Sequence, residues 1–196
     1  MKNFRYVLFF IFCVSSSVVF ADNERYTLDE THLSIGFLVD HAGYAKTLGM
    51  FTNASGSFMY DKEKGVVSDV QIVIDTSSVF TNHEKRDSHL RSPDFLNVDK
   101  YPEMTFMANT NNLKTNPGKI EGTLTLLGVS KPLTLNAKIN KIDIYPFRIG
   151  LSKPLVIGVS ASATFKRSDF GMNYAVEKKL VGDEINLIIE FEARQE

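Results

Sequence analysis

Cysteine is almost absent from this sequence of 196 residues, and tryptophan is absent altogether. The only cysteine, Cys13, lies in an apolar segment close to the N-terminus. Phe10-Ile11-Phe12 precedes it, where a lipoprotein signal requires small residues. The rest of the chain therefore cannot form a disulfide, a thiolate metal site or a cysteine nucleophile. Its stability has to come from side-chain packing and backbone hydrogen bonds.

An excess of charge of one sign is also missing. The chain has 22 Lys and Arg against 23 Asp and Glu, which gives a formal net charge of −1. Proteins that bind nucleic acid present a concentrated basic face, and segments that bind anionic membranes by charge alone are polybasic. The composition therefore argues against a nucleic-acid partner and against a polybasic membrane-surface mode.

No hydrophobic run reaches the length of about 20 residues that a membrane-spanning helix needs. The apolar stretch over residues 7–20 follows Lys2 and Arg5 and ends at Val19-Phe20-Ala21. A basic start, a short apolar core and an exit with a small residue are typical of a secretory signal peptide. We predict a cleaved signal peptide over residues 1–21, one domain over residues 22–196 and a periplasmic location. A retained anchor is the alternative.

The chain is rich in apolar residues that recur with period two. Because successive side chains of a strand point to opposite faces, this pattern predicts strands with one dry face each. The alternation is clear over residues 34–40, 69–75, 104–109, 133–140 and 185–192, and weaker over 48–61, 120–127 and 157–165. Turn residues at 61–65, 116–119 and 181–183 separate several of these segments. The sequence predicts an all-β sandwich or barrel of about eight strands, with a short extra strand at 26–29.

One segment departs from the strand pattern. Thr81-Asn82-His83-Glu84 has the form of a capping box, in which a Thr oxygen and a Glu carboxylate satisfy free amides of a first helical turn. Pro93 discourages helical geometry at Ser92. The sequence predicts one short helix over about residues 82–91, near the rim of the barrel.

Whether the barrel is hollow or filled is left open by the residues alone. Eight strands enclose a space that fits packed side chains or one small ligand. The small residues Gly122, Ala161 and Ala163 at predicted inward positions favour a hollow interior. The alternative is that some of the fifteen phenylalanines fill the same space.

Several motifs together resemble the YceI-like family of secreted polyisoprenoid-binding proteins. They cover almost the whole of the predicted domain, in order: Tyr26-Thr27-Leu28-Asp29, Thr31-His32-Leu33-Ser34, Val39-Asp40-His41-Ala42-Gly43, Thr47-Leu48-Gly49-Met50-Phe51, Arg86-Asp87-Ser88-His89-Leu90-Arg91-Ser92-Pro93-Asp94-Phe95, Tyr101-Pro102-Glu103-Met104-Thr105-Phe106, Gly122-Thr123-Leu124-Thr125-Leu126-Leu127-Gly128-Val129-Ser130-Lys131-Pro132-Leu133 and Arg167-Ser168-Asp169-Phe170-Gly171-Met172. The resemblance implies an eight-stranded antiparallel lipocalin-like barrel with an elongated apolar cavity for a polyisoprenoid or an isoprenoid quinone. Residues 142–154 have no counterpart among these motifs.

The predicted contacts of the lipid are inward-facing apolar side chains of the strands, of the helix and of the loops that carry the motifs above. They are Phe37, Val39, Phe51, Val70, Ile72, Ile74, Leu90, Phe95, Met104, Phe106, Leu124, Leu126, Leu135, Ala161, Phe165, Phe170, Leu187 and Ile189.

Four polar residues are candidates for contact with a lipid head group: His41, Arg86, His89 and Arg91. Arginine binds phosphate well through its planar fork. The interpretation we favour is structural, with Asp87 and the arginines tying the helix to the barrel rim.

The residues predict neither a metal site nor a cofactor, because no HExxH or other ligand-pair motif occurs. The predicted partner is a long-chain apolar lipid, with transient contact to the inner membrane and a homodimer through an unpaired strand edge as further expectations. Two alternatives to a lipid-binding protein that is not an enzyme stay open. One is a lipid-modifying enzyme that uses His41 or His89, and the other is an envelope stress protein that acts through a partner surface and has a filled core.

Overall fold

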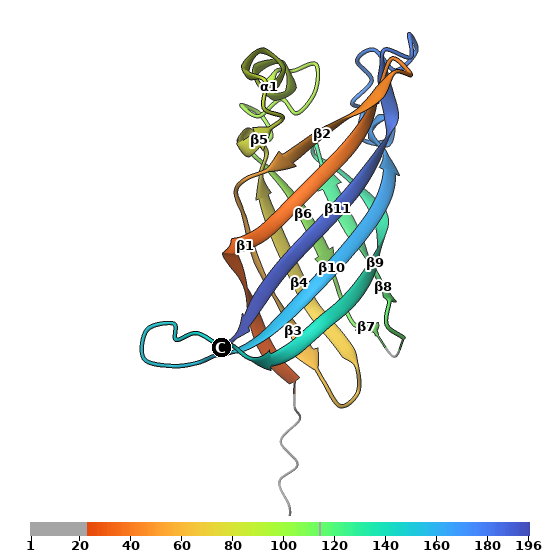
Figure 1. Ribbon diagram of the computed structural model, residues 1–196. Coiled ribbons are helices and arrows are strands. Elements are labelled where there is room, and N and C mark those ends of the chain that lie inside the picture. The colour runs from red at the N-terminus through yellow and green to blue at the C-terminus, as the bar shows by residue number, and fades with distance from the viewer. Residues whose placement is uncertain (1–22, 114) are drawn as a thin grey trace, which may run out of the picture.

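A computed structural model describes residues 23–113 and 115–196. The predicted signal peptide lies outside these residues. Eight antiparallel strands form the barrel (Figure 1): β1 (Asn23–His41), β3 (Ala54–Asp61), β4 (Val66–Asp75), β6 (Glu103–Ala108), β8 (Gly118–Leu126), β9 (Val129–Ile144), β10 (Leu155–Lys166) and β11 (Val181–Gln195). The smaller elements are β2 (Ala45–Phe51), β5 (Val79–Phe80), β7 (Asn111–Asn112), α1 (Glu84–Arg91) and the 3₁₀ turns η1 (Thr76–Ser78) and η2 (Arg167–Phe170).

The barrel closes because β1 pairs with β11, the last strand of the chain, from Tyr26 opposite Gln195 to His41 opposite Val181. The other side of β1 pairs with β3 near its start and with β2 near its end. The eight-stranded antiparallel barrel predicted from the sequence is therefore confirmed. Closure pairs the edges of β1 and β11, so a dimer through a long free edge has little support here and stays a prediction.

Two details of the predicted strand pattern were wrong. The short extra strand over residues 26–29 is the first part of β1, which continues to His41 without a turn. The predicted turn at 181–183 is the start of β11. Gly182 makes this pairing possible, because a Cβ at this position would lie 2.9 Å from the Cβ of Asp40.

Alternation places one face of each strand in the interior. On β10, Ile157, Val159, Ala161 and Ala163 are buried, whereas Ser162 and Thr164, which follow the last two of them, are exposed. Burying these apolar faces provides most of the driving force for folding. The same burial of apolar side chains on the other strands gives the barrel a mainly apolar interior.

β1 contains a bulge between Leu28 and Leu33, where these six residues lie against three of β11, from Ala193 to Phe191. The carboxylate of Asp29 holds this bulge by accepting hydrogen bonds from the backbone N–H of Thr31 at 3.1 Å and from its hydroxyl at 2.7 Å. His32 Nδ1 lies 3.0 Å from the second carboxylate oxygen, and Arg194 of β11 donates to that oxygen. A bulge of this kind bends a strand and re-aims its side chains.

The predicted helix is present, but its N-terminal cap was predicted wrongly. His83 is the N-cap, and its Nδ1 accepts a hydrogen bond from the backbone N–H of Arg86 at 3.2 Å. Thr81 does not cap the helix. Its backbone N–H donates to the Asp87 carboxylate at 2.8 Å, and its hydroxyl donates to the same carboxylate. The helix ends at Arg91, and Ser92 is extended before Pro93 as expected.

The helix lies at one end of the barrel, next to β5 (Figure 1). The turn after β1 and residues 171–180 are at the same end, and the connection between β9 and β10 projects at the opposite end. In the part of the chain that the structure describes, no helix has the length and apolar character needed to cross a membrane.

Candidate functional site

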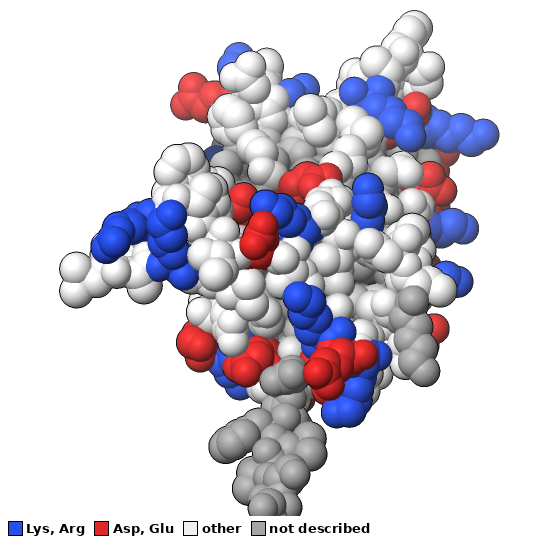
Figure 2. Space-filling view, turned by 60° about the horizontal axis from the view of Figure 1, so that its bottom comes forward, with Lys and Arg blue, Asp and Glu red and all other residues white. Residues whose placement is uncertain are grey.

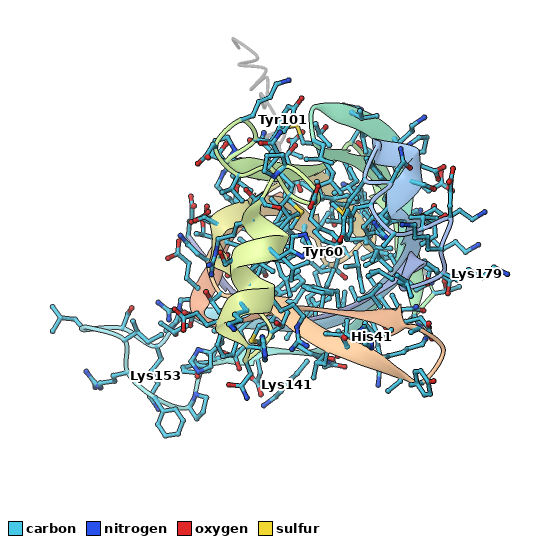
Figure 3. The ribbon with its side chains drawn as sticks, turned by 90° about the horizontal axis from the view of Figure 1, so that it is seen from above. His41, Tyr60, Tyr101, Lys141, Lys153 and Lys179 are labelled. Atoms are coloured by element: carbon cyan, nitrogen blue, oxygen red, sulfur yellow. The ribbon has the colours of Figure 1, made fainter. Side chains whose placement is uncertain are left out.

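The interior of the barrel contains a cavity of about 200 Å³. The cavity extends from Leu90 in α1 and Phe95 in the loop after it to Val67 and Leu113 near the opposite end of the barrel. Figure 3 looks down into the ring of strands from the α1 end, with Tyr60 in its interior. On β11 the cavity follows the strand from Val181 to Phe191, which corresponds to roughly 33 Å of extended chain. The cavity is therefore long and narrow.

All of the predicted lipid contacts except Phe170 lie on the wall of this cavity. They come from the inward faces of seven barrel strands, from β2, and from α1 and the loop after it. The residues that the structure brings together are Phe37, Val39, Phe51, Val70, Ile72, Ile74, Leu90, Phe95, Met104, Phe106, Leu124, Leu126, Leu135, Ala161, Phe165, Leu187 and Ile189. Their contact with a lipid stays a prediction.

Phe170 is buried but does not reach the cavity. Its ring packs edge-on against Phe165 at a centroid distance of 5.4 Å. Phe170 belongs to η2, so the alternation of a strand does not determine where it points. Phe170 therefore lies behind Phe165 and supports this residue, which does line the cavity.

The small residues predicted to leave space differ in what they do. Gly122 leaves none, because a Cβ there would lie 2.5 Å from the ring of Phe106, which already covers the position. Ala161 does face the cavity, and its neighbour across the β9–β10 pair, Ala137, faces it too. Ala163, the third of the small residues predicted to leave space, is buried but does not lie on the cavity wall. Of the three predicted positions, Ala161 is therefore the one that leaves space for the cavity.

The wall also contains residues that the sequence reasoning did not select. Most belong to the same alternating faces and could have been found by extending the period-two pattern along each strand. These residues are Leu28, Leu33, Ile35, Phe58, Tyr60, Val67, Leu113, Ile120, Leu133, Ala137, Ile139, Ile157, Val159, Val181, Ile185 and Phe191, together with Val79, Leu96, Met172 and Arg167.

Arg167 is the charged residue of the wall, and it is almost completely buried. Its Nε donates to the carbonyl of Gly182 at 2.7 Å, and its Nη1 donates to that of Met172 at 2.8 Å. Its Nη2 donates to Tyr174 and Val181. Burial lowers the pKa of the guanidinium, and the nearby Asp183 carboxylate opposes that shift. The side chain therefore fixes residues 172–182 over the end of the barrel and turns its nitrogens away from the cavity.

No polar atom of the described residues faces the free space of the cavity. Apolar cavities of this kind stay dry and accept apolar guests, because water inside would lack hydrogen-bond partners. The cavity can consequently hold a hydrocarbon, but it offers no group for acid–base chemistry or for recognition of a polar head.

The four candidates for head-group contact lie outside the cavity wall. Arg86 donates to the hydroxyl and the carbonyl of Thr81, each at 2.7 Å. Arg91 donates to the carbonyls of Ser77 at 2.8 Å and Val79 at 3.1 Å. These bonds tie α1 to the segment before it, which agrees with the structural interpretation favoured above.

The two histidines of that group are partly or fully exposed. His41, which is labelled in Figure 3, lies at the end of β1 on the rim of the barrel. The Nε2 of His89 lies 2.8 Å from Asp94, and its ring packs edge-on against Phe95 and Tyr174 at 5.0 Å each. Head-group contact by any of the four stays a prediction.

One cluster of possible metal ligands was not foreseen. Asp29, His32 and Glu192 bring three ligand atoms within 4.8 Å of one another on the outer side of the β1 bulge. Arg194 already donates to Asp29 in this cluster. A guanidinium therefore provides the positive charge that a cation would bring, and the cluster is explained as part of the β1–β11 contact.

Comparison with known proteins gives consistent matches over most of the chain. The family model described as YceI-like domain matches residues 26–193. Protein YceI of Shigella flexneri is 36% identical over 184 residues, which are 93% of this chain and 91% of that protein. A UPF0312 protein of Shewanella baltica (strain OS185) is 36% identical over 168 residues, which are 84% of this chain and 85% of that protein.

Solved structures show the same fold. The YceI protein of Campylobacter jejuni is 32% identical with a TM-score of 0.70, and the match covers 80% of this chain and 90% of that one. A polyisoprenoid binding domain from Saccharophagus degradans, implicated in plant cell wall breakdown, is 18% identical with a TM-score of 0.62. That match covers 87% of this chain and 98% of the other, and at this identity it shows the fold alone.

Proposed function

The chain belongs to the YceI-like domain family, and from this premise we propose that it binds, transports or stores a long apolar lipid of the polyisoprenoid class in the periplasm. The observation that carries the proposal is the long cavity without a polar atom facing its free space. The similar fold of the polyisoprenoid binding domain from Saccharophagus degradans supports the choice of lipid class. The N-terminal pattern of residues 1–21 supports export.

Burial of hydrocarbon provides the binding free energy, at roughly 25 cal/mol for each Å² removed from water before ordering costs are counted. A free volume of about 200 Å³ is below the 300–1,000 Å³ of common ligand pockets. Uptake of a long chain therefore requires side chains of the wall to change rotamer and move apart. The wall suits this requirement, because Leu, Ile, Phe and Met side chains form most of it.

The cavity selects for apolar character and not for a particular head group. Since no polar atom of the described wall faces the free space, a polar head gains nothing inside and has to remain at an end of the barrel. We expect a polyprenol and its phosphate to bind with similar affinity. Discrimination between chains of different length is expected to be modest, at about 1–3 kcal/mol per methylene.

The proposal includes no catalysis. His41 and His89, the residues of the enzymatic alternative, do not line the cavity, so neither contacts an enclosed lipid. The partner-surface alternative required a filled barrel, and the long cavity gives it no support. Turnover of isoprenyl phosphates by the purified protein would favour the enzymatic alternative instead.

The central experiment narrows the cavity at Ala161. The substitution Ala161→Leu adds a branched side chain to the buried wall and occupies much of the free volume. We expect binding of a radiolabelled polyprenol to weaken at least tenfold while the melting temperature stays equal or rises, since filling a cavity often stabilises a fold. The matched control is Ser162→Leu, which adds the same side chain to the outer face of β10.

Two results would overturn the proposal. The first is unchanged polyprenol binding in Ala161→Leu, because that would place the lipid outside the cavity. The second is a lipid-free preparation of the unaltered protein that takes up neither polyprenols nor isoprenoid quinones. Native mass spectrometry of protein exported by its own cells, followed by extraction, would identify the bound species.

A further inference from the structure

The connection between β9 and β10, residues 145–154, forms a small projecting hairpin that we call the finger. At its base the backbone N–H of Tyr145 donates to the carbonyl of Pro154 at 2.8 Å. Near its tip the N–H of Ile149 donates to the carbonyl of Ser152 at 2.9 Å, and Gly150 turns the chain with a φ of 63°. Figure 1 shows the finger standing away from the barrel beside the C-terminus. The tip is thus a built turn held clear of the rest of the molecule.

The tip exposes large apolar side chains. Leu151 is 96% exposed and Phe147 is 68% exposed, and Ile144, the last residue of β9 before the finger, is 60% exposed. Single apolar residues on a surface are common and need no explanation. Here they gather on one hairpin, where the Phe147 ring packs edge-on against Tyr145 of the same hairpin at a centroid distance of 5.8 Å. The side chains of Phe147 and Leu151 nevertheless stay mostly in water in the isolated molecule.

The charges of the finger are all positive. Arg148 and Lys153 flank the apolar tip, and no acidic residue occurs over residues 144–154. Neither cation forms an ion pair with any acid among the residues that the structure describes. Figure 2 shows positive side chains gathered on this projection behind an uncharged tip, although the whole chain has a net charge of −1. The finger therefore complements a negatively charged partner.

The chemistry of the finger fits the surface of an anionic lipid bilayer. Apolar side chains enter the boundary between head groups and acyl chains, while neighbouring cations remain at the phosphates. A protein partner fits less well, because a stable interface buries on the order of 1,000 Å² or more and the tip of one hairpin offers far less. We propose that the finger docks the barrel reversibly on anionic membranes, with Phe147 and Leu151 inserted and Arg148 and Lys153 at the phosphates.

The finger is well placed to connect a membrane with the cavity. The finger connects β9 to β10. Ile139 of β9 and Ile157 of β10 line the cavity near the base of the finger. Burial raises the pKa of the Tyr145 hydroxyl, and the nearby Glu192 carboxylate on β11 raises it further, so the base of the finger lies close to the barrel wall. The docking itself does not depend on the proposed function. Only its purpose does, because docking would bring the lipid carrier to the membrane that contains its lipid.

The absence of tryptophan allows a direct test, because one introduced tryptophan is a unique fluorescent reporter. Exported Leu151→Trp protein is mixed with vesicles of phosphatidylglycerol and phosphatidylcholine, and with vesicles of phosphatidylcholine alone. We expect a blue shift with the anionic vesicles and quenching by brominated acyl chains. The matched control is Tyr44→Trp, because Tyr44 is 92% exposed at the opposite end of the barrel and should report no shift.

Cosedimentation measures the contribution of each part of the finger. Phe147→Ser with Leu151→Ser should weaken binding to anionic vesicles at least tenfold, and Arg148→Gln with Lys153→Gln should remove the preference for anionic over neutral vesicles. All four side chains are exposed, so the melting temperature should not change. All variants are produced and purified in the same way, so any effect of residues 1–22 on vesicle binding is the same in each of them.

Three results would overturn docking by the finger. They are failure of the unaltered protein to bind anionic vesicles, an equal shift at Tyr44→Trp, and a shift at Leu151→Trp that depends on protein concentration without vesicles. The last result would assign the tip to a second copy of the chain. Polyprenol uptake measured without vesicles should be the same in all finger variants, so failure of docking and failure of lipid binding are observed separately.

Discussion

At the scale of single residues, Asp29 connects the two ends of the chain. It lies in the bulge of β1 and accepts hydrogen bonds from Thr31 in the same bulge and from Arg194 on β11. Burial by itself would raise the pKa of this carboxyl, but the hydrogen bonds from Thr31, His32 and Arg194 together outweigh burial and hold the pKa far below its ordinary value. The ionised carboxylate therefore stabilises the folded barrel.

We expect Asp29→Asn to reduce the free energy of unfolding at pH 7 by about 2 kcal/mol, since charged hydrogen bonds of a buried group are lost. A pKa lowered by folding contributes stability that is complete above the unfolded-state value of about 3.9. That contribution declines as the pH falls from the unfolded-state value towards the much lower folded-state value, and it is gone below both. The difference between the two proteins should thus shrink below about pH 4.

Urea denaturation between pH 3 and pH 7 measures this difference. Glu30→Gln is the control, because it removes one negative charge from an exposed position of the same bulge. A difference that stays constant down to pH 3 would show that the Asp29 carboxylate is not the source of the stability.

The residues of the cavity wall show what the sequence can and cannot predict at this scale. Phe106 and Ile189 were predicted to face inward because each is part of a regular alternation, and both line the cavity. Arg167 follows the last residue of β10 and is placed by the carbonyls of residues 172–182, so no local pattern indicates it. The bulge at Asp29 carries a usable signal, because Asp with Thr two residues later is typical of an Asx turn.

At the scale of elements, α1 is a short helix whose position depends on polar contacts. Asp87 is buried on its inner side and binds the backbone and hydroxyl of Thr81. Arg91 reaches from its last turn to the carbonyls of Ser77 and Val79. The position of the helix could be predicted from Pro93 and the break in alternation. The capping group could not, because Thr81 fits a capping box in sequence but binds Asp87 in three dimensions.

Asp87→Ala should detach α1 from the segment before it, because it leaves the buried N–H of Thr81 without an acceptor. A loss of about 1–3 kcal/mol in the free energy of unfolding is expected. Hydrogen exchange of residues 79–91 should accelerate before exchange of the barrel strands. Lys85→Ala changes an exposed position of the same helix and should leave exchange unaltered. Equal protection in both variants would contradict the role assigned to Asp87.

At the scale of the whole molecule, closure of the barrel joins β1 to β11 across almost the full length of the chain. Periodicity predicts strands and their faces, but it does not determine which strands are neighbours. β1 pairs with three partners, and no feature of its sequence alone indicates this. The closed order was expected from the resemblance to a family, whereas the finger had no counterpart there and was found only in the structure.

The cavity of about 200 Å³ has a consequence for the response of the molecule to hydrostatic pressure. Unfolding removes internal void volume, so compression favours the unfolded chain in proportion to the space that the folded state leaves empty. Lipid-free protein should unfold at a lower pressure than protein loaded with polyprenol, and high-pressure fluorescence of its tyrosines would measure both midpoints. Ala161→Leu without lipid should fall between them, and equal midpoints for all three would contradict the assignment of the void. The cargo would then act as an internal support that makes the loaded carrier the less compressible form.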